Sequence, residues 1–575
     1  MPLRSSPNID GLLALTGIAS AEPAAKSPVL HCSVKAKTKP AAARLPKSKR
    51  PSKPQAPQAK STTTMDPTFY RTPADAMAAP AEQLAYVAGF DPAHKHEDAV
   101  FVVDLDRASA TYGRAVHKTN VPAGSELHHF GWNACSSALK HCGHGHGPAA
   151  ASLQRRYLIV PGLRSSDIFV LDTAPDPRAP VLVKTVAAAE LADRAGYSRP
   201  HTVHCGPAGV FVTCLGGSDR GRGGGEGATD DGKAEGQEAE EEKEAKEAAG
   251  QPLPGGIALL DHDTFDVLRA WETARGPQRF HYDAWWHLNR NTLVSSEWGA
   301  PSMIEAGLVP ELLLANRYGH ALHFWDLREG RHVQRVELGE EHQMVLEVRP
   351  SHDPEATWGY VGVVVSTKDL SGSVWRWYLD EGKEDEGKKW KVEKVITIPA
   401  QKVEDASKLP PLLQPFGGPV PPIITDIDLS VDDRYLYVSC WVTGELKQYD
   451  VSDPKHPKET GSVRLGGVID PSAHPSRPNE PLGGGPQMVE VSRDGRRIYL
   501  TNSLYSSWDD QFYPDGVGAW MVKVDVLPGG GMEVDKDFFL GADAFEGLRV
   551  HQIRLQGGDA STDSYCYRSE VRANA

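Results

Sequence analysis

The chain has 575 residues, and 62 Lys and Arg against 76 Asp and Glu give it a net charge of −14. This acidic balance argues against nucleic acid as a partner, because phosphate binding requires clustered lysine and arginine. No apolar run approaches the roughly 18 residues of a transmembrane helix, and seven cysteines in so long a chain do not suggest a disulfide framework. The sequence therefore predicts a protein of a reducing compartment without a transmembrane segment.

The N-terminal segment, residues 1–64, is rich in Ala, Pro, Lys and Ser, and Asp10 and Glu22 are its only acidic residues. Such a composition cannot bury a core, so we expect a disordered leader. A basic, acid-poor segment is also typical of an organelle transit peptide, which leaves a chloroplast or a mitochondrion as an alternative location. Met65 is a second plausible start, and the predicted folded domain spans residues 65–575.

After the leader, the chain repeats one pattern: a short β-rich run ends in an acidic turn and a second strand follows. Successive turns lie roughly 55 to 75 residues apart once an acidic block at 218–251 is removed. That block, Gly-rich and then Glu-rich, predicts a solvated loop insertion. Each turn is marked by one aspartate: Asp104, Asp172, Asp261, Asp326, Asp380, Asp450 and Asp525.

Seven such units predict an all-β protein, a seven-bladed β-propeller-like domain. Closure into a ring removes the exposed sheet edges that an open array would leave. A pair of packed β-sandwich domains is the alternative, and the even spacing disfavours it. Helical patterns are short, as in "AAELADRA" at 188–195.

Histidines recur just before or within the apolar runs. The innermost strand of each propeller blade lines a central channel, so side chains far apart in sequence can converge there. Converging imidazoles suit a borderline metal such as Cu, Fe or Zn and leave coordination positions open for catalysis. Adjacent histidines on a regular strand point to opposite faces, so "HH" serves one site only at a strand end or a bend. The predicted metal ligands are His128, His129, His201, His204, His352 and His551, the last in a strand that closes the ring.

Other polar residues in apolar surroundings are candidates for supporting roles. Glu297, in "SSEWGAP", is predicted as a general base or as a carboxylate that orients a histidine, and a hydrogen bond within a blade is the alternative. Gln487 and Met488 are noted because methionine is a soft ligand and glutamine is unusual on an inner strand. The sequence has no P-loop, no dinucleotide fingerprint and no G-x-S-x-G elbow, which argues against nucleotide-dependent chemistry and serine hydrolysis.

Several long motifs, in order, resemble the selenium-binding protein / methanethiol oxidase family: "ELHHFGWNACSS", "HTVHC", "SSEWGAP", "GGPQM", "LTNSLYSSWDDQFYPD" and "HQIRLQGGD". The resemblance runs from about residue 66 to the C-terminus. It implies a β-propeller enzyme that oxidises methanethiol with O2 and water to formaldehyde, hydrogen sulfide and hydrogen peroxide. It also implies a copper site, since bacterial members use copper and relatives carry histidine at all six predicted positions. The family and the cysteine usage together favour the cytoplasm.

The cysteines depart from the family pattern. Relatives bind selenium through cysteine, but this chain has Ala138, Ala560 and Gly113 where relatives often carry one. Cys135 and Cys205 remain as candidates for selenium or thiol binding, and stable selenium attachment is not expected. Two other functions stay open at this point: a non-catalytic selenium- or sulfur-binding or interaction propeller, and an iron-dependent oxygenase.

Overall fold

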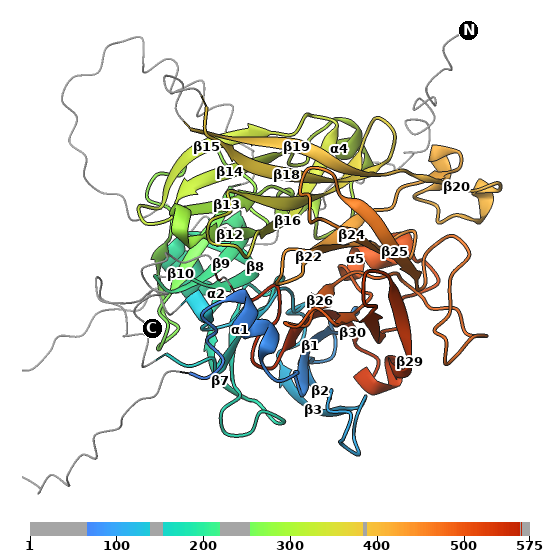
Figure 1. Ribbon diagram of the computed structural model, residues 1–575, viewed down its shortest axis with the longest axis horizontal. Helices are drawn as coiled ribbons and strands as arrows, with labels where there is room; N and C mark the ends of the chain where they lie inside the picture. The colour runs from blue at the N-terminus through green and yellow to red at the C-terminus, as the bar shows by residue number, and fades with distance from the viewer. Residues whose placement is uncertain are drawn as a thin grey trace, which may run out of the picture. The chain divides into compact units, whose positions relative to one another are not determined.

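The computed structural model describes residues 66–137, 153–206, 208–218, 253–382, 388–563 and 565. The predicted leader and, apart from Ser218, the predicted acidic insertion lie outside the described residues. Within these ranges, seven four-stranded antiparallel sheets follow one another around a ring, together with one two-stranded sheet (Figure 1). The fold is the predicted seven-bladed β-propeller.

The blades are numbered along the chain, and each is given from its innermost strand outward. Blade 1 is β4 (Gly131–Trp132), β5 (Tyr157–Pro161), β6 (Ile168–Asp172) and β7 (Val181–Val186). Blade 2 is β8 (Tyr197–Cys205), β9 (Val210–Gly217), β10 (Pro254–Leu260) and β11 (Val267–Ala270). Blade 3 is β12 (Ala284–His287), β13 (Thr292–Ser296), β14 (Ala321–Asp326) and β15 (Arg331–Glu337).

The remaining blades follow the same order. Blade 4 is β16 (His342–Pro350), β17 (Trp358–Ser366), β18 (Gly372–Asp380) and β19 (Lys389–Ile398). Blade 5 is β22 (Ile424–Leu429), β23 (Tyr435–Cys440), β24 (Glu445–Asp450) and β25 (Lys458–Arg464). Blade 6 is β26 (Val489–Val491), β27 (Arg497–Leu500), β28 (Met521–Val526) and β29 (Met532–Leu540). Blade 7 is β30 (Arg549–Leu555), β1 (Leu84–Phe90), β2 (Asp98–Asp104) and β3 (Ala115–Val121).

The elements outside the blades are short. The two-stranded sheet consists of β20 (Gln401–Lys402) and β21 (Pro419–Val420). Among the described residues the α-helices are α1 (Pro73–Ala78), α2 (Ala188–Ala195), α4 (Pro310–Leu314) and α5 (Ser506–Phe512). The helix predicted at 188–195 is therefore confirmed as α2.

Blade 7 closes the ring with strands from both ends of the folded domain. The C-terminal β30 pairs antiparallel with β1, with Ile553 opposite Val87, and is the innermost strand of this blade. This pairing joins the two ends of the folded domain in one sheet and so closes the ring. It also confirms that His551 lies on the strand that closes the propeller.

Six of the aspartates that mark the repeat stand at or directly after the end of the third strand of their blade, and Asp525 stands one residue before the end of β28. In six blades the carboxylate accepts a hydrogen bond, 2.9–3.2 Å long, from the backbone N–H two residues further on. An aspartate that bonds its own backbone in this way sets up a tight turn. The repeat in the sequence is therefore the turn that leads to the outermost strand.

A buried charged cluster lies among the inner strands of blades 3 to 5. The Arg349 guanidinium lies 3.3 Å from a carboxylate oxygen of Asp283, 3.3 Å from one of Asp426 and 3.6 Å from one of Asp428. Burial raises the pKa of Asp426 and of Asp428 to about 7, against the lowering effect of Arg349. We call these four residues the Arg349 cluster.

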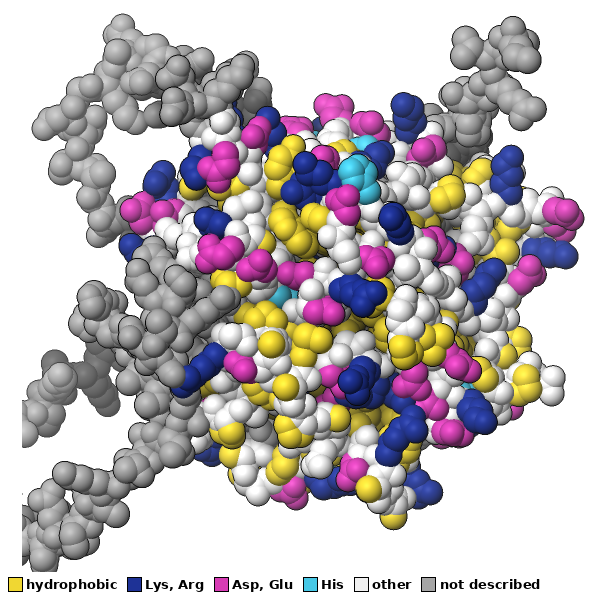
Figure 2. All heavy atoms as spheres, viewed as in Figure 1, with side chains coloured by type: hydrophobic (Ala, Val, Ile, Leu, Met, Phe, Trp, Pro, Cys, Tyr) yellow, Lys and Arg dark blue, Asp and Glu magenta, His cyan; other side chains and the backbone are white. Residues whose placement is uncertain are grey.

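The surface gives no sign of a basic stripe on the face that Figure 2 shows, where cationic and acidic side chains are interspersed. None of the helices in the described parts of the chain is both long and apolar enough to cross a bilayer.

Candidate metal centre

The adjacent histidines lie in a bend directly before β4. The Phe130 N–H donates to the carbonyl oxygen of His128 at 2.7 Å, so the chain turns between the two imidazoles and β4. The rings of His128 and His129 consequently lie on the same side, with centroids 6.0 Å apart and planes 23° apart. A Cβ on Gly131 would lie 2.4 Å from the Val203 carbonyl oxygen, so only glycine lets this segment pack against β8.

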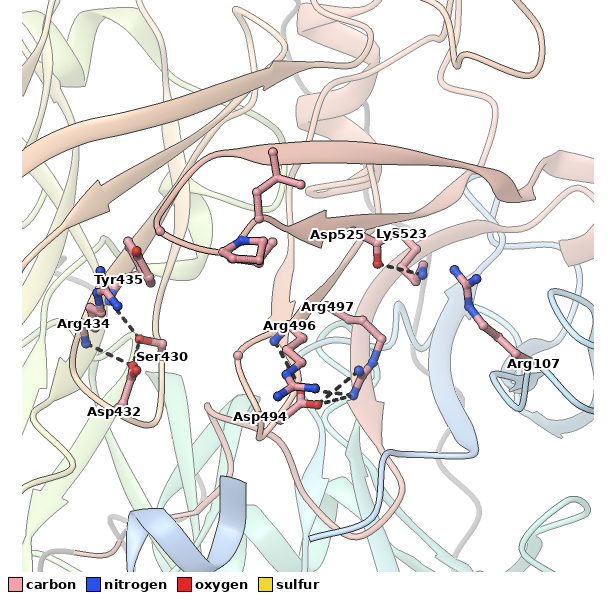
Figure 3. Close-up of a pocket in the computed structure, with 15 residues that line it drawn as sticks. Arg107, Ser430, Asp432, Arg434, Tyr435, Asp494, Arg496, Arg497, Lys523 and Asp525 are labelled. Atoms are coloured by element: carbon pink, nitrogen blue, oxygen red, sulfur yellow. Dashed lines mark hydrogen bonds and ion pairs between the residues drawn. The ribbon is translucent and has the colours of Figure 1, made fainter. Parts of the chain in front are cut away.

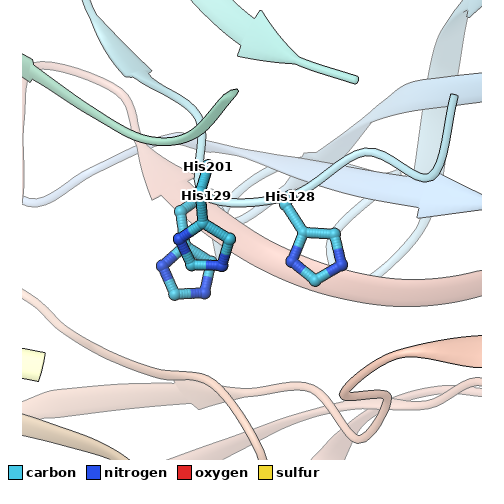
Figure 4. A group of neighbouring side chains, drawn as sticks. All are labelled: His128, His129 and His201. Carbon is cyan, nitrogen blue, oxygen red and sulfur yellow. The ribbon is translucent and has the colours of Figure 1, made fainter. Parts of the chain in front are cut away.

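Two further histidines from neighbouring blades join this pair. His201 of β8 places its ring 4.4 Å from the ring of His129, and His551 of β30 places its ring 4.1 Å from that of His128. One ring nitrogen from each of His128, His129 and His201 can be chosen so that all three lie within 4.8 Å of one another (Figure 4). We call His128, His129, His201 and His551 the histidine site.

The hydrogen bonds of the histidine site leave nitrogens free. Nδ1 of His551 lies 2.7 Å from the Ser503 carbonyl oxygen, which requires that nitrogen to carry the proton, and Nδ1 of His201 lies 2.9 Å from the Thr202 hydroxyl. Nε2 of all four rings is buried without a hydrogen-bond partner among the described residues. A buried unpaired polar atom costs about 1–3 kcal/mol, so the four unpaired Nε2 atoms of these neighbouring rings are available to a ligand.

The histidine site also favours neutral imidazoles. Burial lowers the pKa of His201 to about 3 and that of His551 to about 4, with a backbone hydrogen bond opposing the shift in His551. Burial and the neighbouring imidazoles hold the pKa values of His128 and His129 well below the usual range. Neutral imidazole is the form that binds a metal ion.

Glu347 and Tyr282 are site residues that the sequence analysis missed. Tyr282 precedes β12 and packs its ring 4.5 Å from that of His201, and its hydroxyl donates to Glu347 Oε1 at 2.8 Å. The same carboxylate oxygen lies 3.9 Å from Nδ1 of His129, and burial and nearby Asp426 raise the Glu347 pKa well above its ordinary value. In the sequence, the signal for Glu347 was a single glutamate within the apolar run 344–348 of β16.

His204 and His352 do not reach the histidine site, contrary to the prediction. His204 lies three positions after His201 on β8, which places it on the other face of the strand, and its Nε2 lies 3.3 Å from Asp283. His352 follows the far end of β16, where its Nε2 lies 3.3 Å from the Leu429 carbonyl oxygen.

Glu297 is also placed away from the histidine site. Its carboxylate accepts from His323 of β14 at 2.8 Å, and the other nitrogen of His323 lies 2.9 Å from His332 of β15. The alternative that the sequence left open, a hydrogen bond within a blade, is the one the geometry supports. We call Glu297, His323 and His332 the blade 3 triad.

Cys135 and Cys205 form a disulfide, whereas the sequence suggested no disulfide framework and made them candidates for selenium or thiol binding. Their Cα atoms are 6.1 Å apart, although the residues are separated by 70 positions. The pairing follows from the fold, because β4 and β8 are the inner strands of adjacent blades and are in contact. Cys135 follows β4, and Cys205 is the last residue of β8. With both sulfurs in this bond, neither residue offers the thiolate that selenium or thiol binding requires unless the bond is first reduced.

A groove of about 640 Å³ lies between hairpin turns of blades 5, 6 and 7 (Figure 3). Those turns are at the end of the blades where the inner strands finish. Two of its cations contact carboxylates within the groove: Lys523 lies 2.9 Å from Asp525, and Arg497 lies 3.1 Å from Asp494. Internal ion pairing makes this groove a weaker candidate for a reactive site than the unpaired imidazoles.

Comparisons with known proteins identify the family. Residues 63–250 and 241–566 match the family model described as 56 kDa selenium-binding protein. A methanethiol oxidase from Xenopus tropicalis is 36% identical over 86% of this chain and 97% of its own length. Mouse selenium-binding protein 2 is also 36% identical over 86% of this chain and 97% of its own.

A solved structure supports the same relationship. The X-ray structure of a hypothetical selenium-binding protein from Sulfolobus tokodaii is 47% identical, with a TM-score of 0.76 over 88% of this chain and 100% of that chain. The fold and the resemblance drawn from the sequence motifs are both confirmed. The chain belongs to the 56 kDa selenium-binding protein family.

Proposed function

We propose that this protein is a methanethiol oxidase whose histidine site holds copper. The observation that carries the proposal is a group of four buried neighbouring imidazoles with unpaired Nε2 atoms, three of which, those of His128, His129 and His201, have the spacing of a metal site. Relatives named methanethiol oxidase in frog, fish and mammals support the substrate, a small thiol, and the co-substrate O2. In the proposed reaction, methanethiol, O2 and water give formaldehyde, hydrogen sulfide and hydrogen peroxide in equal amounts.

The donor set fits copper. Imidazole nitrogens bind copper well, and three or four of them leave a position for substrate. When bound, copper would lower the pKa of a thiol, bind its soft sulfur and pass electrons between that sulfur and O2. The residues that would hold it are His128, His129, His201 and His551.

The chain itself supplies orientation, a proton site and a dry environment. Ser503 and Thr202 fix the Nδ1 sides of His551 and His201, so that their Nε2 atoms face the site. Glu347 Oε2 is buried without a partner among the described residues, and Oε1 of the same carboxyl lies 3.9 Å from Nδ1 of His129, so we assign this carboxyl the role of holding the thiol proton. Because all four histidines are at most 3% exposed, bulk water is excluded from the imidazoles.

The test is an assay for all three products. The purified chain, loaded with copper, is incubated with methanethiol and O2, and formaldehyde, sulfide and peroxide are measured. We expect equal amounts of the three, and His204→Asn as a matched control should keep the activity because His204 lies outside the histidine site. Copper-loaded protein that consumes no methanethiol would overturn the proposal. The cytoplasmic location stays a prediction from the sequence.

A further inference from the structure

An aromatic wall borders the histidine site. Tyr282, Trp298 and Tyr505 come from three different segments, and each is at most 1% exposed. Tyr505 packs 4.2 Å from the ring of His128, as Tyr282 does 4.5 Å from that of His201. Trp298 lies between the two tyrosines, edge-on to each at 5.2 Å between centroids. The three rings, which we call the aromatic wall, therefore form one continuous chain of contacts that runs from His128 through Trp298 to His201.

Neighbouring residues fix the position of the Trp298 ring in the aromatic wall. Trp508 of α5 packs 5.4 Å from Trp298, and its Nε1 donates to the Ile304 carbonyl oxygen at 2.9 Å. A Cβ on Gly299 would already lie 3.2 Å from the Tyr318 ring, so the backbone beside Trp298 has no room to withdraw on that side. Interiors packed in this way do not yield to an extra methylene without cost. The Trp298 ring is thus held in place between the two tyrosines that contact the histidine site.

Two hydrogen-bond donors of the wall are unused. The Tyr505 hydroxyl and Trp298 Nε1 are buried without a hydrogen-bond partner among the described residues. The Tyr282 hydroxyl, in contrast, donates to Glu347. An apolar surface with two free donors suits a small molecule that has one apolar end and one atom able to accept a hydrogen bond.

We infer that Trp298 determines the chain length of the thiol that the site accepts. The fixed ring leaves room for the methyl group of methanethiol and excludes the added carbons of longer n-alkyl thiols. This inference rests on the proposed function, since it assigns the substrate to the histidine site.

A longer thiol would follow the same balance of atoms and electrons. The C–S bond and one C–H bond of the carbon next to sulfur break, and water supplies the oxygen of the aldehyde that forms. That carbon loses two electrons, which reduce O2 to hydrogen peroxide. The sulfur leaves as hydrogen sulfide, so each alkanethiol gives the aldehyde of its own chain length.

The experiment compares Trp298→Ala and the milder Trp298→Leu with the parent, all loaded with copper. Methanethiol and 1-propanethiol are titrated without O2, and binding is followed by the visible spectrum of the copper protein. The kcat/KM of each thiol is then measured with O2. We expect the preference for methanethiol over 1-propanethiol to fall by about tenfold or more in both measurements, because one methylene in a tight pocket is worth about 10–200-fold.

Trp441→Leu is the matched control. Trp441 is also fully buried, but its ring packs on Phe512 and Tyr513 and not on the wall tyrosines. It should leave the thiol preference unchanged. A Trp298 variant that loads copper and keeps the parent's ratio of thiol affinities would overturn the inference, as would a parent that binds both thiols equally.

The two proposals fail in different ways. A parent protein that binds methanethiol selectively without oxidising it contradicts the proposed oxidase activity but supports the selection of thiol chain length by the aromatic wall. If the parent protein oxidises methanethiol and the Trp298 variants lose activity on both thiols in parallel, the oxidase activity is supported and the role of Trp298 in chain-length selection is contradicted.

Discussion

The histidine site and the blade 3 triad are both buried groups of imidazoles, and they differ in how their nitrogens are used. In the triad, His323 has a partner for each nitrogen, Glu297 at 2.8 Å and His332 at 2.9 Å. In the histidine site, every Nε2 is unpaired among the described residues. Imidazoles that satisfy one another contribute to packing, whereas imidazoles that converge unsatisfied are available to a ligand.

The largest expected effect comes from removing two rings of the histidine site. His128→Ala combined with His129→Ala should abolish copper binding and lower methanethiol turnover by at least about 100-fold, since even changes outside the ligand shell cost about 10–100-fold. Copper content by plasma mass spectrometry and the product assay check this. Circular dichroism should stay that of the parent; a variant that keeps stoichiometric copper would contradict the assignment.

The Arg349 cluster gives a contrasting case, in which one buried cation contacts three carboxylates. Arg349→Met leaves Asp283, Asp426 and Asp428 without their common cation and should lower the free energy of unfolding by about 3–5 kcal/mol. Chemical denaturation measures the change. The control is Arg331→Met, which removes an ion pair to Glu329 on the surface and should cost about 0–1 kcal/mol. Equal effects of the two substitutions would show that burial of the cluster has no energetic consequence.

The blade 3 triad should respond in stability and not in metal binding. His323→Phe leaves the Glu297 carboxylate and His332 without their hydrogen bonds and should lower the free energy of unfolding by about 1–3 kcal/mol. Copper content should not change, because the triad contributes no ligand to the histidine site. Loss of copper in a folded His323→Phe protein would erase the distinction between the two groups.

The last expected effect is a pH dependence at Asp428. Its pKa in the folded chain, about 7, is raised from 3.8 by burial, so the stability it contributes is present at low pH and is lost as the pH rises towards 7. The penalty of Asp428→Asn should therefore be larger at pH 5 than at pH 7.5, by about 1–3 kcal/mol. Denaturant titrations at the two pH values test this. A stability penalty of Asp428→Asn that grows with pH would contradict the prediction.

The fold could be predicted from the sequence because the pattern that marks each blade lies within a few consecutive residues. The marker aspartates are turn residues, and in six blades their carboxylates bond backbone N–H groups two positions on, so their spacing reports the blades directly. The closing strand followed from the position of His551 after the last unit. The predicted all-β ring is the one observed.

Only part of the histidine site could be predicted from the sequence, because the site depends on the direction in which each side chain points as well as on its position in the chain. His128, His129, His201 and His551 converge, but His204 points to the other face of β8 and His352 lies past the end of β16. Sequence spacing shows neither the bend at Phe130 nor the adjacency of β4 and β8. That adjacency also pairs Cys135 with Cys205, which lie too far apart in sequence to be recognised as partners.

The most direct test of the account is electron paramagnetic resonance of the chain loaded with one equivalent of Cu²⁺. If the unpaired imidazoles of the histidine site hold the metal, the spectrum will show one copper species with hyperfine coupling to at least three nitrogens, and His551→Ala will reduce that number. A spectrum without imidazole coupling, or one that His551→Ala leaves unchanged, would contradict the central claim that these four histidines form the metal centre.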